Sequence, residues 1–270
     1  MEFSIKQSNS EKQRSACVVV GVFAGGKLSL AAQNLDKAAQ NALSDVITQD
    51  DMTGKLATTL LLPRVVGIAA ERVLLVGLGK ASEFSTKQFL DVVRATFTAL
   101  HKTPCKDAAL FLSDLVVKGR DEAWKIKQIA LLGSESAFRG DHLKSAPSTA
   151  ASLKKILLGC AEKPNSAAQT TLLQAAAIAD GMTLTKTLGN LPGNICTPTY
   201  LAEQAKALAK TYSLKATVLE EKDMEKLGMF SLLSVSRGSR EPAKLITLEY
   251  NGGDKKQKPI GLVGKGITCD

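Results

Sequence analysis

The stretch RVLLVGLGKASEFSTKQFLDVVRATFTALHK, residues 72–102, joins an apolar run directly to a helical pattern. Its first eight residues are rich in Val and Leu and end in glycine, which is typical of a buried strand. Residues 85–102 carry apolar side chains at helical spacing, and Ser85 can cap the start of that helix. A strand followed by a helix is the repeating unit of α/β proteins.

The same alternation continues on both sides of this stretch. Strand-like runs rich in Val, Ile or Leu occupy residues 16–23, 107–116 and 153–160, and a helical pattern covers residues 30–47. We therefore expect an N-terminal α/β domain over residues 1–160.

A change of character at residues 161–190 predicts a linker helix. This stretch is rich in alanine after Pro164, and the sequence GNLPGN ends it. We expect a second α/β domain to begin at residue 191 and to be cut short at residue 270. Its predicted elements are a helix over 198–212, a strand over 215–220, a short helix over 221–229 and strands over 243–250 and 258–266.

The composition bounds the class of protein. With 270 residues and 44% hydrophobic content, the chain can bury a substantial core. It has no run of about 18 apolar residues and no apolar signal segment at its start, so we expect a cytoplasmic protein without a membrane partner. The five cysteines form no C-x-x-C pair, which favours reduced, mostly buried thiols over a zinc cluster or a disulfide framework.

The net charge of +9 raises the possibility of nucleic-acid binding. The lysines are scattered along the chain, however, and aromatic residues make up only 4% of it. Nucleic-acid surfaces usually combine a basic stripe with interleaved aromatic side chains. The distribution therefore disfavours nucleic acid as a partner, and a solvated surface explains the charge equally well.

Two other kinds of site have little support in the sequence. The sequence GVFAGGKL, residues 21–28, matches a phosphate-binding loop except at Leu28, where a Ser or Thr hydroxyl must reach magnesium. The only histidines, His101 and His142, each stand alone near a predicted helix end, so a histidine metal site or a Ser-His triad has little support. Any chemistry must be carried by carboxylates and lysine.

The sequence GLVGKGITCD, residues 261–270, supplies both residue types. Gly264 and Gly266 permit a sharp turn around Lys265, and Asp270 follows five residues later. We expect this turn at the carboxyl edge of a parallel sheet, where α/β proteins bind ligands. Aspartate suits hard divalent cations, and a nearby dication in a desolvated pocket lowers the pKa of lysine enough for a neutral amine to bind. Taken alone, however, such a pair more often forms a salt bridge between the two side chains at the strand end.

Three sequence blocks carry a family resemblance. GNLPGNICTPTYLAEQAKALA (189–209), LGMFSLLSVSRGSREPAKLITLEYNG (227–252) and PIGLVGKGITCD (259–270) resemble, in order and spacing, the leucine aminopeptidase (cytosol aminopeptidase) family of M17-type dinuclear metallopeptidases. The N-terminal part is similar to the macro-like accessory domain of that family. The resemblance thus implies a macro-like α/β domain, a linker helix and the start of an α/β metallopeptidase domain.

The resemblance also implies a mechanism. Lys265 and Asp270 match two metal ligands of the family, in which the aspartate bridges two divalent ions, manganese or zinc, and the lysine binds one of them as a neutral amine. The ions polarise the scissile carbonyl of peptide substrates with a free N-terminus and activate the attacking water. Family members assemble as hexamers, so we expect a homo-oligomer.

Departures from the family pattern limit these expectations. The family's other three metal ligands and its catalytic lysine and arginine would follow residue 270, so we expect an N-terminal portion that is inactive alone. Cys269 stands where the family usually has Phe. Two alternatives remain: a macro-like module that binds nucleotide or nucleic acid, and a naturally short protein that assembles with a longer partner.

Overall fold

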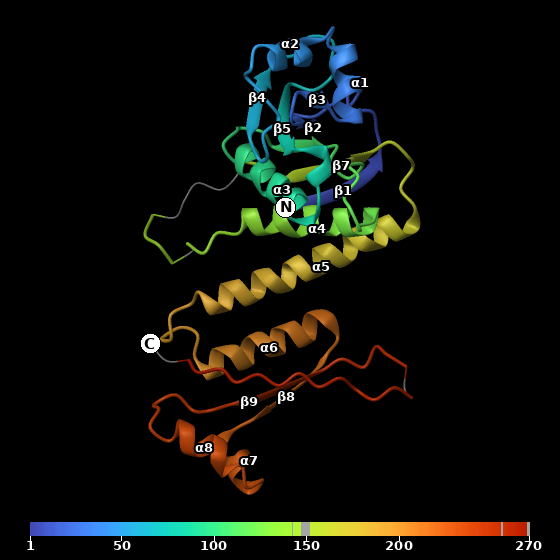
Figure 1. The fold of residues 1–270 in the computed structure, drawn as a ribbon. Coiled ribbons are helices and arrows are strands. Elements are labelled where there is room, and N and C mark those ends of the chain that lie inside the picture. Colours follow the sequence, from blue (N-terminus) through green and yellow to red (C-terminus); the bar gives the residue numbers. More distant parts are fainter. Residues whose placement is uncertain (142, 147–151, 255, 269–270) are drawn as a thin grey trace. The chain divides into compact units, whose positions relative to one another are not determined.

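The chain folds into two compact units, one over Met1–Thr185 and a second that begins at Lys186 (Figure 1). The structure, a computed structural model, describes residues 1–141, 143–146, 152–254 and 256–268. No helix among the described residues has the length and apolar character that a membrane crossing requires.

The first unit is built on a mostly parallel sheet. Its strands are β1 (Glu2–Gln7), β2 (Val18–Phe23), β3 (Lys27–Leu28), β4 (Thr59–Pro63), β5 (Arg72–Gly79), β6 (Asp107–Leu110) and β7 (Lys155–Cys160). The described strands are ordered β1-β7-β6-β2-β5-β4, and β3 pairs with β2 outside this path. The strands β1, β7, β6, β2 and β5 are parallel to one another. Strand β4 pairs antiparallel with β5, and β3 pairs antiparallel with β2. The predicted α/β fold class is therefore confirmed.

Helices cover this sheet on both faces. They are α1 (Leu30–Ala38), α2 (Ala42–Thr48), the short 3-10 helix η1 (Ala81–Glu83), α3 (Thr86–Leu100), α4 (Glu122–Ala137) and α5 (Ser166–Gly189). Alternate residues of the central strands enter different cores: Val19 and Leu74 belong to the cluster that contains α3 and α4, whereas Val18 and Leu75 belong to the cluster with α1 and α2. Burial on both faces explains why β2 and β5 read as continuous apolar runs.

Several predicted elements of the first unit are confirmed. Strand β5 has the predicted bounds, and α3 begins after Ser85, which forms a capping box with Gln88. The single helix predicted over residues 30–47 is wrong, because Gln40 and Asn41 adopt left-handed backbone angles (φ 54° and 70°) and separate α1 from α2. The sequence pattern does not indicate the strands β1, β3 and β4 or the helix α4.

The second unit has mixed elements and an antiparallel pair of strands. It contains α6 (Pro198–Tyr212), β8 (Lys215–Leu219), α7 (Glu221–Lys226), α8 (Phe230–Ser236) and β9 (Leu245–Glu249). Helix α6 has the predicted bounds, and β8 and β9 pair antiparallel from Lys215 opposite Glu249. The strand predicted over residues 258–266 is wrong: these described residues form neither helix nor strand.

Candidate metal centre

Local signals fix the elements that lead toward Lys265. Helix α6 begins at Pro198, and the Thr197 side chain accepts a hydrogen bond from the Tyr200 backbone N–H at 3.2 Å. Helix α6 ends at Tyr212, and the left-handed backbone of the next residue, Ser213 (φ 54°), turns the chain into β8. A proline at the first helical position and a left-handed residue after the last turn are ordinary helix boundaries.

Acidic side chains near α7 are engaged in holding the second unit together. Glu220 and Asp223 form a capping box at the start of α7, and Glu220 also pairs with Lys244 just before β9. Glu221 accepts a hydrogen bond from the Ala243 backbone N–H at 2.9 Å. These contacts fasten α7 to the chain before β9 and assign the three carboxylates to structure.

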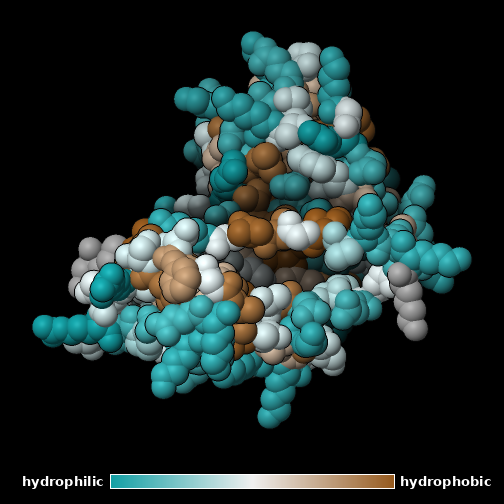
Figure 2. All heavy atoms as spheres, turned by 90° about the horizontal axis from the view of Figure 1, so that it is seen from below, coloured by the Kyte–Doolittle hydropathy of each residue, from teal (hydrophilic) through white to brown (hydrophobic). Residues whose placement is uncertain are grey.

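Lys265 lies in a highly exposed segment. Residues 259–267 are all exposed, and the apolar Ile260, Leu262 and Val263 are 91%, 94% and 102% accessible. Apolar side chains of α8 are also exposed, with Phe230 at 64%. Figure 2 shows that hydrophobic residues reach the surface on one face of the chain. Several consecutive exposed apolar residues in one unit are typical of a surface that packs against more protein.

The predicted pairing of Lys265 with Asp270 involves a residue outside the described part of the chain, as does Cys269. Among the described residues, no group of three or more His, Cys, Asp or Glu side chains could hold a metal ion. The predicted location is also corrected: Lys265 does not follow a strand of a parallel sheet.

The other candidates have structural roles. Residues 21–28 include the turn between the antiparallel strands β2 and β3, in which Phe23 pairs with Lys27. A phosphate-binding loop would instead lead from the strand directly into a helix. His101 lies at the end of α3, with its Nε2 2.9 Å from the Ser136 hydroxyl. Burial and then the Arg139 charge lower the pKa of His101. His142 lies outside the described residues.

The thiols behave as predicted where the structure describes them. Cys17, Cys105 and Cys160 are buried, Cys196 is half-buried, and all four are free. Burial, as the largest cause, raises the pKa of Cys17 to about 12 and that of Cys160 to about 11. Thiols with raised pKa values are poor nucleophiles and poor metal ligands at neutral pH.

A buried lysine that the sequence analysis did not single out also has a structural role. The Lys125 ammonium donates a hydrogen bond to the Leu115 carbonyl oxygen at 2.8 Å, and burial lowers its pKa. The nearby Asp114 carboxylate opposes this shift. Lys125 therefore fixes the loop that follows β6.

Comparison with known proteins assigns the chain as a whole. Residues 19–147 match the profile described as "Cytosol aminopeptidase family, N-terminal domain", and residues 183–270 match "Cytosol aminopeptidase family, catalytic domain". The chain belongs to the cytosol aminopeptidase family. The predicted resemblance is thus confirmed, and the exposed segment around Lys265 lies within the matched part of the family's catalytic domain.

Relatives in the cytosol aminopeptidase family are similar along the whole chain. A probable cytosol aminopeptidase of Nitrosomonas europaea is 54% identical over 272 residues, which cover 100% of this chain and 55% of the relative. One of Nitrosospira multiformis is 54% identical over 275 residues, covering 100% of this chain and 53% of the relative. The chain therefore spans about half the length of the curated relatives it matches.

Solved structures share the fold. A mutant of tomato leucine aminopeptidase matches with a TM-score of 0.75 and 23% identity, over 92% of this chain and 50% of that one. The bottromycin maturation enzyme BotP matches with a TM-score of 0.69 and 22% identity, over 88% of this chain and 46% of that one. BotP has also been solved in complex with Mn.

Proposed function

We propose that this chain is the N-terminal portion of a metal-dependent aminopeptidase that releases N-terminal amino acids of the leucine type from peptides. The observation that carries the proposal is the match of residues 183–270 to the catalytic domain of the cytosol aminopeptidase family. The preceding match of residues 19–147 to the N-terminal domain of the same family supports it. The substrates proposed are peptides with a free N-terminus.

Lys265 and Asp270 are the proposed metal ligands in this chain. Their residue types fit the proposal, because a carboxylate can bridge two hard cations and a neutral amine can bind one. Two bound divalent ions, manganese or zinc, would supply a Lewis acid and a water of lowered pKa. The BotP complex with Mn supports metal dependence in a protein of this fold.

The proposed enzyme is longer than this chain. The exposed apolar residues Ile260, Leu262 and Val263 support this, because burying each of them would stabilise the second unit by about 1.5–3 kcal/mol. We assign residues 1–160 to the accessory domain, 161–190 to the linker helix and 191–270 to the first part of the catalytic domain. A cytosolic location is proposed in line with the names of the relatives, which are cytosol aminopeptidases. A homohexamer is proposed from the family resemblance alone.

The test uses the protein extended to the length of its relatives. We expect manganese-dependent hydrolysis of leucyl-p-nitroanilide, and no hydrolysis of the N-acetylated analogue, because the blocked substrate lacks the free amine. A chelator should abolish the reaction and added metal should restore it. Turnover that survives complete metal removal, or equal turnover of the acetylated substrate, would contradict the proposal.

A further inference from the structure

Strand β1 has an open edge. It pairs with β7 on one side, and no described strand pairs with its other side. The backbone N–H groups of Glu2 and Ser8 donate to β7-side carbonyls at 2.8 Å and 3.0 Å. Because successive residues in a strand point their backbone groups to opposite sides, those of Phe3 and Ile5 face the open edge.

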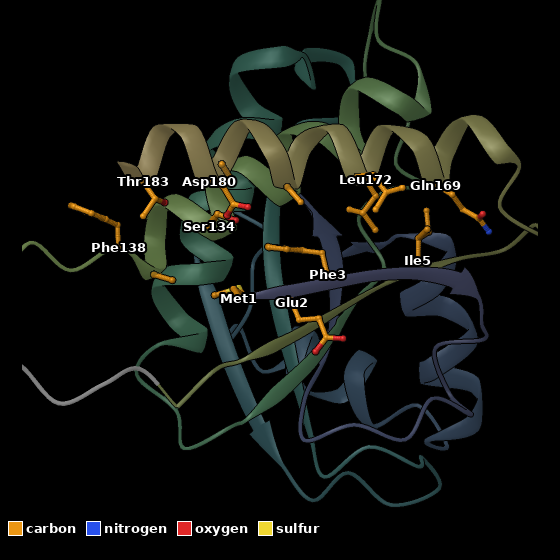
Figure 3. A pocket seen from close by; sticks show the side chains of 14 residues that line it. Met1, Glu2, Phe3, Ile5, Ser134, Phe138, Gln169, Leu172, Asp180 and Thr183 are labelled. Carbon is orange, nitrogen blue, oxygen red and sulfur yellow. The ribbon is translucent and has the colours of Figure 1, made fainter. Parts of the chain in front are cut away.

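The two faces of β1 differ in character. Phe3 and Ile5 are half-buried and line a groove of about 720 Å³ between β1, α4 and α5, all within the first unit. Figure 3 shows the side chains of Phe3 and Ile5 on the side of β1 that faces α5, whereas Glu2 points away from α5. Glu2, Ser4 and Lys6 are exposed and alternate with the apolar pair. One face of the open strand is thus apolar, and the other carries one charge of each sign.

The order of these residues makes the strand complementary to itself. When two copies of β1 run antiparallel with Ser4 opposite Ser4, Glu2 of each copy lies opposite Lys6 of the other. Phe3 then lies opposite Ile5, and these are the residues whose backbone groups face outward, so each Phe3–Ile5 pair exchanges two hydrogen bonds. We propose that the open edge of β1 binds β1 of a second copy of this chain in this register.

Other registers lose these features. A slip of one residue pairs outward-facing backbone groups with inward-facing ones, and a slip of two residues separates Glu2 from Lys6. The one ion pair that Glu2 makes among the described residues joins it to Lys155 at 3.8 Å, and both side chains are more than 70% exposed, so it competes weakly. Lysine on an edge strand normally opposes pairing, but here it faces a carboxylate.

Charge reversal tests the register in solution. The 270-residue chain should form a concentration-dependent dimer in sedimentation velocity experiments at low salt. Glu2→Lys and Lys6→Glu should each weaken dimerisation about tenfold, because two attractive pairs become repulsive. The double variant Glu2→Lys/Lys6→Glu should restore it. A chain that stays monomeric up to millimolar concentration, or a double variant as weak as the single ones, would overturn the proposal.

Cross-linking tests the contact without relying on affinity. Ser4 is exposed. In the proposed register, Ser4 of one copy lies opposite Ser4 of the other at a non-hydrogen-bonded position, where the two Cα atoms are about 4.5 Å apart. Under mild oxidation, Ser4→Cys should give a disulfide that joins two peptides containing residue 4, identified by mass spectrometry. The exposed control Ser82→Cys should not form its symmetric cross-link. Equal cross-linking of both variants, or none at residue 4, would refute the pairing.

Discussion

Asp36 supplies the cap that allows two helices to follow each other where the sequence predicts one. The residue is only 6% exposed. One carboxylate oxygen accepts hydrogen bonds from the backbone N–H groups of Leu43 (2.8 Å) and Ser44 (3.1 Å), and the other accepts one from the Ser44 hydroxyl (2.5 Å). Asn41, at the N-cap position of α2, makes no side-chain cap bond. The carboxylate from α1 therefore satisfies the first turn of α2.

Replacing Asp36 with Ala should lower the free energy of unfolding of the first unit by about 2–4 kcal/mol. Loss of a helix cap costs about 0.5–2 kcal/mol, and a buried donor left without an acceptor costs about 1–3 kcal/mol. Asp36→Asn keeps one acceptor oxygen for the two N–H groups, so it should cost less than half as much. Asp45→Ala removes an exposed carboxylate from α2, the helix that Asp36 caps, and should cost less than about 1 kcal/mol.

Urea unfolding followed by tryptophan fluorescence measures this effect. The chain has 1 tryptophan, Trp124, and it lies in α4 of the first unit, so the signal reports that unit. The Asp36→Ala midpoint should fall clearly below that of Asp45→Ala at an unchanged slope. Equal midpoints for these two variants would refute the capping role of Asp36.

Three further predictions follow from the described contacts and the proposed ligand set. Lys125→Met should lower the free energy of unfolding by about 1–3 kcal/mol, because the buried Leu115 carbonyl loses its donor, whereas the exposed Lys118→Met should be neutral by urea unfolding. Iodoacetamide at pH 8 should label Cys196 and leave Cys160 unmodified in peptide maps of the folded protein, since the pKa of Cys160 is raised to about 11; labelling of both at equal rates would contradict this. The 270-residue chain should show no chelator-sensitive hydrolysis of leucyl-p-nitroanilide with manganese or zinc, because two ligands alone do not hold a metal pair about 3.5–4 Å apart.

The sequence predicts best those elements whose signals are local. Strand β5 and helix α6 have their predicted bounds because a continuous apolar run, a helix-capping threonine and a proline each act within a few residues. The break between α1 and α2 depends instead on Asp36, which bonds to residues seven and eight positions later. Strand β1 is a short stretch in which polar and apolar residues alternate. Its partner strand β7 lies about 150 residues later in the sequence. A local sequence pattern does not predict contacts between residues that are this far apart.

The candidate site shows a different limit. The residue types of Lys265 and Asp270 allow either a metal site or a salt bridge, and only the resemblance to the cytosol aminopeptidase family favours the metal. The strand predicted for residues 258–266 is wrong because an apolar run forms a stable strand only when neighbouring strands supply its hydrogen bonds and cover its side chains. Local pattern identifies such a run but not its partners.

The most direct test of the proposed metal site is a comparison of metal content and leucyl-p-nitroanilide turnover among three variants of the protein extended to the length of its relatives. Asp270→Ala should lose turnover by about 10³-fold or more together with bound metal, because a bridging carboxylate holds both ions. Lys265→Ala should lose less, and Cys269→Ala should stay near the unsubstituted protein in both measurements. If Asp270→Ala kept near-normal turnover and two bound ions per chain, the assignment of Lys265 and Asp270 as metal ligands would be wrong.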